Sequence, residues 1–334
     1  MKQSSAQETD TSLPLVIVNP KSASGSTRDK WSAVAADLRA HFGPFAVAFT
    51  KGPGDGTAIA ERAAKAGRKF LIACGGDGTI NEVVNGIINS GEDVEFGVLP
   101  SGTGGDFRRS LGMPQNHRDA AVALRDGITK TIDVGRVTFH DHDGDEMSRY
   151  FVNVSSAGLA AEVIKRVKSQ KIFDWLPLEA LRGKANFAAS TLQEIVNLEG
   201  TTLRVRFDDG DEHQLRTIAF CVANARYFGG GMMIAPDAKL SDGLLNVVNI
   251  GDLTTARIVM KAPSLYRGTL GSMQEVRMTK ARRIEISAAD PGEEILIETD
   301  GELPGKLPAT YEIIPNALSI RVPRPQPPNG EKYC

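Results

Sequence analysis

The sequence lacks the features that mark several common classes of protein. Its three cysteines, Cys74, Cys221 and Cys334, show no Cys-x-x-Cys spacing, so neither a zinc site nor a disulfide framework is predicted. No stretch approaches the roughly 18 uncharged apolar residues that a membrane-spanning helix needs. Residues 1–12 are polar, unlike a signal peptide. These absences favour a protein of the reducing cytoplasm.

An excess of charge of one sign is also missing. The 334 residues include 39 Lys and Arg against 41 Asp and Glu, a formal net charge of -2. This balance argues against bulk nucleic-acid binding, so we expect no nucleic-acid partner. With 41% hydrophobic and 24% charged residues, the composition is typical of a globular protein, and the length allows two domains.

Three familiar catalytic motifs are absent. There is no Gly-x-x-x-x-Gly-Lys-Ser/Thr and no His-Glu-x-x-His, and the five histidines are scattered. His117-Arg118-Asp119 resembles the protein-kinase catalytic loop, but Leu124 stands where that loop needs a metal-binding asparagine. We interpret this segment as the start of a helix with Asp119 in its first turn.

What the sequence does contain is a glycine-rich turn between a strand and a helix. Phe70–Ala73 is a short apolar run, Gly75–Gly78 follows, and apolar residues then recur at helical spacing to Ile88. Helix N-termini at the carboxyl edge of an α/β sheet favour phosphate. Asp77 in this turn would then hold Mg²⁺ or accept a proton. An ordinary β-to-α turn would give the same local pattern.

The first part of the chain alternates strands, loops and helices. Strands are predicted at 13–18, 45–50, 70–73 and 95–99, and Asp55 is the expected N-cap of a helix over 57–66. This alternation predicts an α/β domain over residues 13–131, with a mostly parallel sheet and helices on both faces.

From Ile132 the strands follow one another directly, with hairpin turns within Thr138–Gly144 and Phe207–Asp211. We expect an antiparallel, sandwich-like β-rich domain over 132–317, interrupted by a helical insertion at about 160–198. Residues 1–12 and 324–334 are expected to be flexible tails. The strands expected here are Val152–Val154, Leu203–Phe207, Ile218–Val222, Leu244–Ile250, Ile284–Ser287, Ile295–Glu298 and Tyr311–Ile314.

Three loops follow successive strands of the first domain: Asn19–Gly25, Gly75–Asn81 and Ser101–Asp106. Because such loops meet at one edge of a parallel sheet, together they could cradle a triphosphate with backbone amides. In the second domain, Thr299–Glu302 is by itself a common turn. The loop Ala235–Gly243 offers carboxylates of the kind that bind Mg²⁺.

Several motifs occur in one order along the chain. They are Asn19-Pro-Lys-Ser, Gly75-Gly-Asp-Gly-Thr-Ile-Asn-Glu-Val83, Leu99-Pro-Ser-Gly-Thr-Gly-Gly-Asp-Phe107, Gly229-Gly-Gly, Ser241-Asp-Gly-Leu-Leu245 and Asp300-Gly-Glu302. On these motifs the chain resembles the diacylglycerol kinase and sphingosine kinase superfamily, in its bacterial soluble branch, from about Leu13 to Pro323. NAD kinases share Gly-Gly-Asp-Gly-Thr but lack the later motifs.

The resemblance implies an ATP-binding first domain, a lipid-binding second domain, and a return of residues 318–323 to the first domain. It makes Glu302 the proton acceptor with Asp300 beside it, and it gives Asp77 either a basic or a metal-linked role. The ATP positions it implies are Asn19, Thr50, Gly75, Gly76, Asp77, Gly78, Thr79, Ile80, Asn81 and Thr103. The structural Mg²⁺ falls on the carboxylate of Asp242 and on Lys239 and Leu244, through their backbone carbonyls.

Two positions depart from the superfamily pattern. Ala23 replaces a usual glycine in the first loop, and Gly105 replaces the usual asparagine before Asp106. The second change removes an amide side chain near the acceptor site, so it bears on the identity of the lipid more than on the reaction.

These features lead us to expect an ATP- and Mg²⁺-dependent lipid kinase with a diacylglycerol-like acceptor, cytoplasmic and in peripheral contact with the membrane. Sphingoid bases or ceramide as acceptors, or an NAD kinase-like activity, are the alternatives among enzymes. A non-catalytic nucleotide- or lipid-binding regulator is the alternative from another class, and the presence of Asp77, Asp300 and Glu302 together disfavours it. A homodimer is also compatible with the sequence.

A basic cluster in the expected helical insertion leads to a first prediction. Lys165, Arg166, Lys168 and Lys171 precede the interfacial aromatic Trp175, although a solvated helix with Trp175 packed inward would give the same pattern. Turnover on anionic vesicles should fall with rising salt, and replacing all four cations by alanine should flatten that dependence. An unchanged salt profile in the variant would remove the cluster from membrane binding.

Overall fold

The computed structural model describes residues 11–22, 25–101, 105–158, 161, 200–253 and 255–325. The expected insertion at about 160–198 with its basic cluster, Thr103 and Ala23 therefore lie outside the described residues, apart from position 161. Among the described residues, no helix is both long and apolar enough to cross a bilayer.

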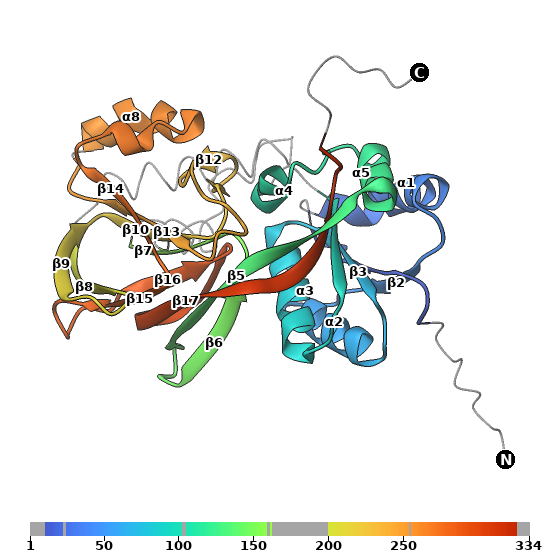
Figure 1. The fold of residues 1–334 in the computed structure, drawn as a ribbon, viewed down its shortest axis with the longest axis horizontal. Helices are drawn as coiled ribbons and strands as arrows, with labels where there is room; N and C mark the ends of the chain where they lie inside the picture. The colour runs from blue at the N-terminus through green and yellow to red at the C-terminus, as the bar shows by residue number, and fades with distance from the viewer. Residues whose placement is uncertain are drawn as a thin grey trace.

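The first domain is a parallel sheet between two layers of helices (Figure 1). Its strand order is β4-β3-β1-β2, and every pair within it is parallel. The elements in chain order are β1 (Leu15–Val18), α1 (Ser26–His41), β2 (Ala46–Phe49), α2 (Asp55–Lys65), β3 (Phe70–Gly75), α3 (Asp77–Ser90), β4 (Glu95–Pro100), α4 (Asp106–Leu111) and α5 (His117–Asp126).

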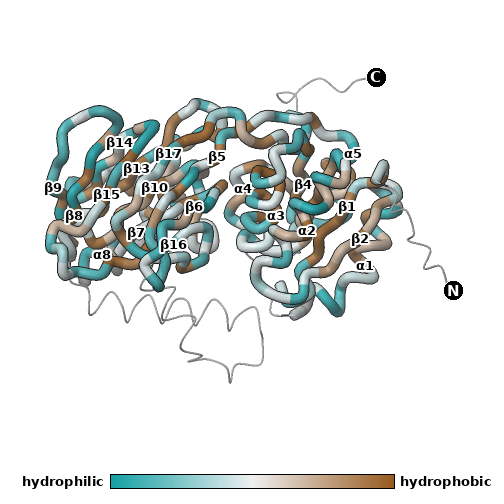
Figure 2. Tube along the Cα trace, turned by 90° about the horizontal axis from the view of Figure 1, so that it is seen from below, coloured by the Kyte–Doolittle hydropathy of each residue, from teal (hydrophilic) through white to brown (hydrophobic). Residues whose placement is uncertain are grey.

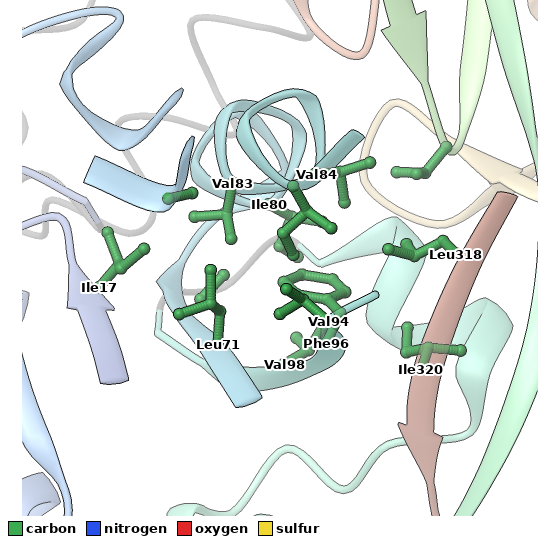
Figure 3. Packing of buried hydrophobic residues seen from close by; sticks show 14 of the residues in the cluster. Ile17, Leu71, Ile80, Val83, Val84, Val94, Phe96, Val98, Leu318 and Ile320 are labelled. Carbon is green, nitrogen blue, oxygen red and sulfur yellow. The ribbon is translucent and has the colours of Figure 1, made fainter. Parts of the chain in front are cut away.

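Alternating residues of the buried strands pack against opposite layers. In β1, Ile17 joins the core cluster under α2 and α3, whereas Val16 and Val18 join the cluster under α1 and α5. Figure 3 shows Val83 and Val84 of α3 in the first of these clusters. This confirms the predicted α/β architecture with helices on both faces, because strands covered on both sides must be apolar in every residue.

The second domain is built from antiparallel strands. The turns expected within Thr138–Gly144 and Phe207–Asp211 join β5 to β6 and β8 to β9, as predicted. The elements are β5 (Ile128–His140), β6 (Glu146–Phe151), β7 (Val154–Gly158), β8 (Thr201–Phe207), β9 (Glu212–Thr217), β10 (Ala219–Ala223), β11 (Tyr227–Phe228), β12 (Met232–Met233), β13 (Leu245–Ile250), α8 (Thr255–Arg267), the 3₁₀ helix η2 (Leu270–Ser272), β14 (Val276–Ala281), β15 (Arg283–Ala288), β16 (Leu296–Thr299) and β17 (Glu302–Val322).

Two local predictions were wrong. Asp55 is the first residue of α2 and not its N-cap, because Gly54 takes the left-handed cap conformation and the Asp55 carboxylate accepts a bond from the Lys51 amide (2.7 Å). The strand expected at Val152–Val154 begins only at Val154, since Val152 and Asn153 form a bend between β6 and β7. Their amides are used by an acidic side chain of another loop, described below.

The last strand, β17, joins the two domains. It is 21 residues long and pairs antiparallel with β5 between Lys306 and Val322. At Ser319 and Ile320 it also pairs parallel to β4. Tyr311 lies in the core of the second domain, whereas Leu318 and Ile320 lie in the core of the first. Figure 1 shows this strand passing from one domain to the other, and Figure 3 shows its Leu318 and Ile320 beside the core of the first domain. One sheet therefore extends through both domains.

The buried end of β17 leads to a stability prediction. Ile320 is fully buried against the first-domain core, so Ile320→Ala should lower the free energy of unfolding by about 2–5 kcal/mol. Urea unfolding would measure it. Lys130→Ala is the control, because exposed Lys130 is the register partner of Ile320 in β5. Equal effects of the two substitutions would contradict the packing described here.

Candidate active site where the two domains meet

The loops that follow β1, β3 and β4 lie at one edge of the parallel sheet and are bonded to one another. The Asn19 amide donates to the Cys74 carbonyl (3.0 Å), and the Asn19 side chain donates to the Thr79 hydroxyl (3.1 Å). The first loop is thus fixed to the first turn of α3. Asn19 and Thr79, both expected at the nucleotide, are in direct contact.

A hydroxyl cluster joins the first loop to the third. Thr27 is 1% exposed, and its hydroxyl hydrogen-bonds the hydroxyls of Ser22 (2.7 Å) and Ser101. Sequence analysis did not select Thr27, which is the second residue of α1. A hydroxyl in the first turn of a helix after a glycine loop is the signal that could have indicated it.

The glycine turn of β3–α3 has one closed and one open position. A Cβ at Gly75 would lie 2.4 Å from the Thr79 hydroxyl, so only glycine fits there. A Cβ at Gly76 would meet nothing within 4 Å, and Gly76 is the N-cap of α3 without a side-chain capping bond. The start of α3 at Gly76 therefore borders open space, and a helix N-terminus of this kind favours an anion.

Two other residues expected at the nucleotide, Thr50 and Ile80, are both buried but occupy different places. Thr50 directly follows β2 at the same sheet edge and is 7% exposed, and its amide donates to the Val18 carbonyl (2.9 Å). The Ile80 side chain is buried in the core, so only its backbone faces the turn.

The Asp77 carboxylate is occupied by the N-terminus of α4. It accepts bonds from the amides of Gly105, Asp106 and Phe107, each at 3.1 Å. Gly105 has a φ of 91°, a left-handed conformation that glycine and asparagine adopt readily. Asp77 thus fixes the third loop to the second, whatever further role it has.

Asp300 is buried between the domains. Its carboxylate accepts bonds from the Asn81 side chain (2.8 Å) and from the amides of Val152 (2.9 Å), Asn153 (3.0 Å) and Val154 (3.1 Å). Burial raises its pKa to about 6 against the lowering effect of these hydrogen bonds, and the Asp77 charge adds to the rise. Its bonding capacity is used within the protein, which suits an anchor better than a proton acceptor.

Asn81 extends this contact to β6. Its side chain also donates to the Tyr150 carbonyl (2.8 Å) and accepts from the Arg149 guanidinium (2.9 Å). Asn85, one turn further along α3, bonds both the carbonyl (3.0 Å) and the amide (3.0 Å) of Tyr150. The structure therefore uses the Asn81 side chain to join the domains, and sequence analysis missed Asn85 in the same role.

A second buried acid, Asp106, also joins the two domains. Asp106 is 5% exposed, and its carboxylate accepts a bond from the Gly230 amide (2.7 Å) and pairs with Arg109. Burial raises its pKa, the Gly230 bond opposes that rise, the Asp77 charge adds to it and the Arg109 charge opposes it. The Gly229–Gly231 motif is thereby fixed against α4.

Glu302 is the exposed acid of this region. It is the first residue of β17, and its Oε1 atom lies 3.7 Å from the point where a Cβ of Gly78 would stand. Glu302 and the first turn of α3 therefore face each other across the domain boundary.

The turn that presents Glu302 is held from beneath by a residue that sequence analysis missed. Glu298 is fully buried, and its carboxylate accepts bonds from the Gly301 amide (2.6 Å) and the Ser156 hydroxyl (2.7 Å). The sequence signal that could have identified Glu298 is an acidic residue within an apolar strand, because acidic residues are rarely buried without partners.

The loop expected to hold Mg²⁺ is organised by buried Asp133, whose carboxylate accepts bonds from the amides of Gly243 (2.7 Å) and Asn316 (2.9 Å). Asp242, the carboxylate of the loop, bonds the Leu244 amide (3.3 Å) and pairs with Lys280 (2.9 Å). Among the described residues there is no cluster of three or more His, Cys, Asp or Glu side chains. One carboxylate and the carbonyls of Lys239 and Leu244 fit a hydrated Mg²⁺ in donor type, provided Lys280 moves aside.

Comparison with known proteins gives two family matches. Residues 14–137 match the diacylglycerol kinase catalytic domain, and residues 153–322 match the YegS C-terminal NAD kinase beta sandwich-like domain.

Curated relatives and a solved structure agree with these matches. A diacylglycerol kinase of Bacillus subtilis (strain 168) is 29% identical over 272 residues, 81% of this chain and 83% of that protein. One of Mycobacterium tuberculosis (strain CDC 1551 / Oshkosh) is 27% identical over 310 residues, 92% and 94%. A crystal structure of a diacylglycerol kinase from Bacillus anthracis str. Sterne has a TM-score of 0.66 at 22% identity, and the match covers 94% of this chain and 98% of that chain. The chain belongs to the diacylglycerol kinase family, in its bacterial YegS-like branch, and is a lipid kinase.

Proposed function

We propose that the protein transfers the γ-phosphoryl group of ATP, bound with Mg²⁺, to a hydroxyl of a diacylglycerol-like lipid. The observation that carries the proposal is the position of Glu302 opposite the open first turn of α3, 3.7 Å from a Cβ position at Gly78. A proton acceptor on one domain then faces a phosphate site on the other.

The phosphate site uses the chain's own amides. Among the described residues no side chain caps the first turn of α3 at Gly76, and this turn carries the partial positive charge of a helix N-terminus. Asn19 is fixed to this turn through Thr79, and the third loop is fixed to it through Asp77. Such an arrangement binds phosphates without a lysine-containing P-loop.

In the proposed reaction, Glu302 takes the proton of the lipid hydroxyl as its oxygen bonds to the γ-phosphorus. The bond from that phosphorus to the bridging oxygen of ATP breaks, and ADP leaves with the electron pair. Mg²⁺ brought with ATP would neutralise phosphate charge. The second cation, at Asp242, Lys239 and Leu244, would only stabilise that loop. Asp300 and Glu298 are positioning residues, because they hold the turn before Glu302.

Diacylglycerol is favoured over sphingoid bases and ceramide because the curated relatives are named diacylglycerol kinase. Incubation with labelled ATP and a total lipid extract, followed by identification of the product, decides between these acceptors. A phosphorylated nucleotide cofactor in place of a lipid would instead support the NAD kinase-like alternative.

The role of Glu302 leads to a prediction. Glu302→Gln keeps the size but removes the basic oxygen, so kcat should fall by about 10²–10⁴-fold while ATP affinity stays near wild type. Asp77→Asn should impair both ATP binding and rate, because it weakens the anchor of the third loop. Glu146→Gln, an exposed carboxylate on β6, is the control. A fully active Glu302→Gln with an inert Asp77→Asn that binds ATP normally would reverse the two roles.

Asp300 leads to a prediction about pH. Its folded-state pKa of about 6 exceeds the ordinary 3.8, so the folded protein holds this proton more tightly than the unfolded chain. The stability gained in this way is complete below about pH 4 and is lost as the pH rises to about 6, by up to about 3 kcal/mol.

Urea unfolding of wild type and Asp300→Asn across this range measures the effect. The variant should be less stable throughout, because its amide group cannot accept all four bonds. The difference between the two proteins should shrink as the pH rises toward about 6. A difference that is constant with pH would show that Asp300 titrates normally.

A further inference from the structure

One helix of the second domain is exposed and cationic. Helix α8 lies along the outside of this domain (Figures 1 and 2). Its sequence, Thr255–Arg267, contains three cations and no acidic residue, in a chain whose formal net charge is -2. This local excess of positive charge needs an explanation that the kinase chemistry does not supply.

The cations share one side of α8 with an exposed methionine. Arg257, Met260, Lys261 and Arg267 follow helical spacing and are all exposed. Arg257 pairs with Glu275, whereas Lys261 and Arg267 form no ion pair among the described residues. We call these four residues the α8 face.

Large apolar side chains are also exposed here. Met260 is 66% exposed and Tyr266 is 58% exposed, and Met278 on the neighbouring edge strand β14 is 39% exposed. In the part of the chain that the structure describes, only two other large hydrophobic residues, Phe49 and Met147, are comparably exposed. Tyr266 lies on another side of the helix from Arg257, whereas Met260 lies among the cations, and an exposed apolar side chain among cations is typical of surfaces that lie at a membrane interface.

The α8 face is connected to the active-site region. The residue after the helix, Gly268, is packed against Met233 of β12, where a Cβ would lie 2.6 Å from the sulfur. Strands β11 and β12 flank the Gly229–Gly231 motif, and the Gly230 amide bonds Asp106 of α4. A surface that binds at α8 is therefore close to the loop that lies against α4.

We propose that the α8 face docks the enzyme onto the surface of an anionic phospholipid bilayer. Positive charge complements anionic headgroups, the exposed Met260 can enter the interface, and the lipid acceptor of the kinase resides in such a bilayer. The inference rests on the proposed function, because docking would bring the kinase to the bilayer that contains its lipid acceptor. Docking itself does not require the acceptor, so it should also occur on vesicles that contain no substrate.

The experiment measures sedimentation of the full-length protein with vesicles of phosphatidylcholine, with and without phosphatidylglycerol. Wild type should bind only the anionic vesicles, and less at about 0.5 M than at about 0.05 M salt. Lys261→Glu/Arg267→Glu should weaken binding about tenfold or more. The control Arg118→Glu/Lys130→Glu makes the same charge change at exposed positions of α5 and β5 and should bind nearly as wild type.

A second pair of variants tests the apolar contribution. Met260→Asp should weaken vesicle binding several-fold, whereas Met147→Asp, at the other exposed methionine, should not. Far-UV circular dichroism and turnover on detergent-dispersed lipid should be unchanged in all α8 variants. Absence of lipid turnover in wild type would refute the proposed function while leaving vesicle binding to be judged by itself.

Three results would overturn the docking proposal. They are failure of wild type to bind anionic vesicles, wild-type binding by the α8 variants, and equal loss in the α8 charge variant and in the Arg118→Glu/Lys130→Glu control. If the α8 variants bind like wild type and binding is lost only on replacing Lys165, Arg166, Lys168 and Lys171, the docking proposal is also overturned. The membrane surface would then be that basic cluster.

Discussion

The buried carboxylate of Asp300 is the interaction on which the active-site region depends. A carboxylate removed from water without partners costs several kcal/mol, so its four donors must be in place whenever the protein is folded. Those donors are the Asn81 side chain of α3 and three consecutive amides from Val152 to Val154. The bond between Asn81 and Asp300 fixes α3 to the second domain. Because Asp300 lies two residues before Glu302, the bonds of Asp300 also fix the position of the proposed proton acceptor.

Acidic residues in this protein divide into anchors and exposed groups. Asp77 bonds the amides of α4. Asp106 and Asp133 are buried and bonded to amides of distant loops, and buried Glu298 is bonded to an amide of the turn that follows it. Backbone amides at helix ends and turns are unsatisfied donors, and a carboxylate satisfies them with strong, charge-assisted bonds. A rigid frame of this kind leaves exposed Glu302 as the acid best suited to exchange a proton with a lipid hydroxyl.

The continuous sheet gives this frame its stiffness. Strand β17 contributes Tyr311 to one core and Ile320 to the other, and its partner β5 accompanies it for most of its length. Asp300 and Asp106 each form a hydrogen bond from one domain to the other, so the two domains are held together at the site. Positioning of this kind is what phosphoryl transfer requires, because the protein performs little covalent chemistry of its own.

The sequence by itself determined the alternating first domain, the hairpins of the second and the loops at the sheet edge, because these follow from local periodicity and glycine turns. It could not show that the Asp77 carboxylate bonds α4, that the Asp300 side chain is sealed against the bend at Val152 and Asn153, or that Glu298 supports the next turn. A motif specifies which side chain is present, but its partners lie up to 219 residues away. Only the tertiary structure decides which carboxylates are buried as anchors and which face the site, since burial is a property of the packed chain.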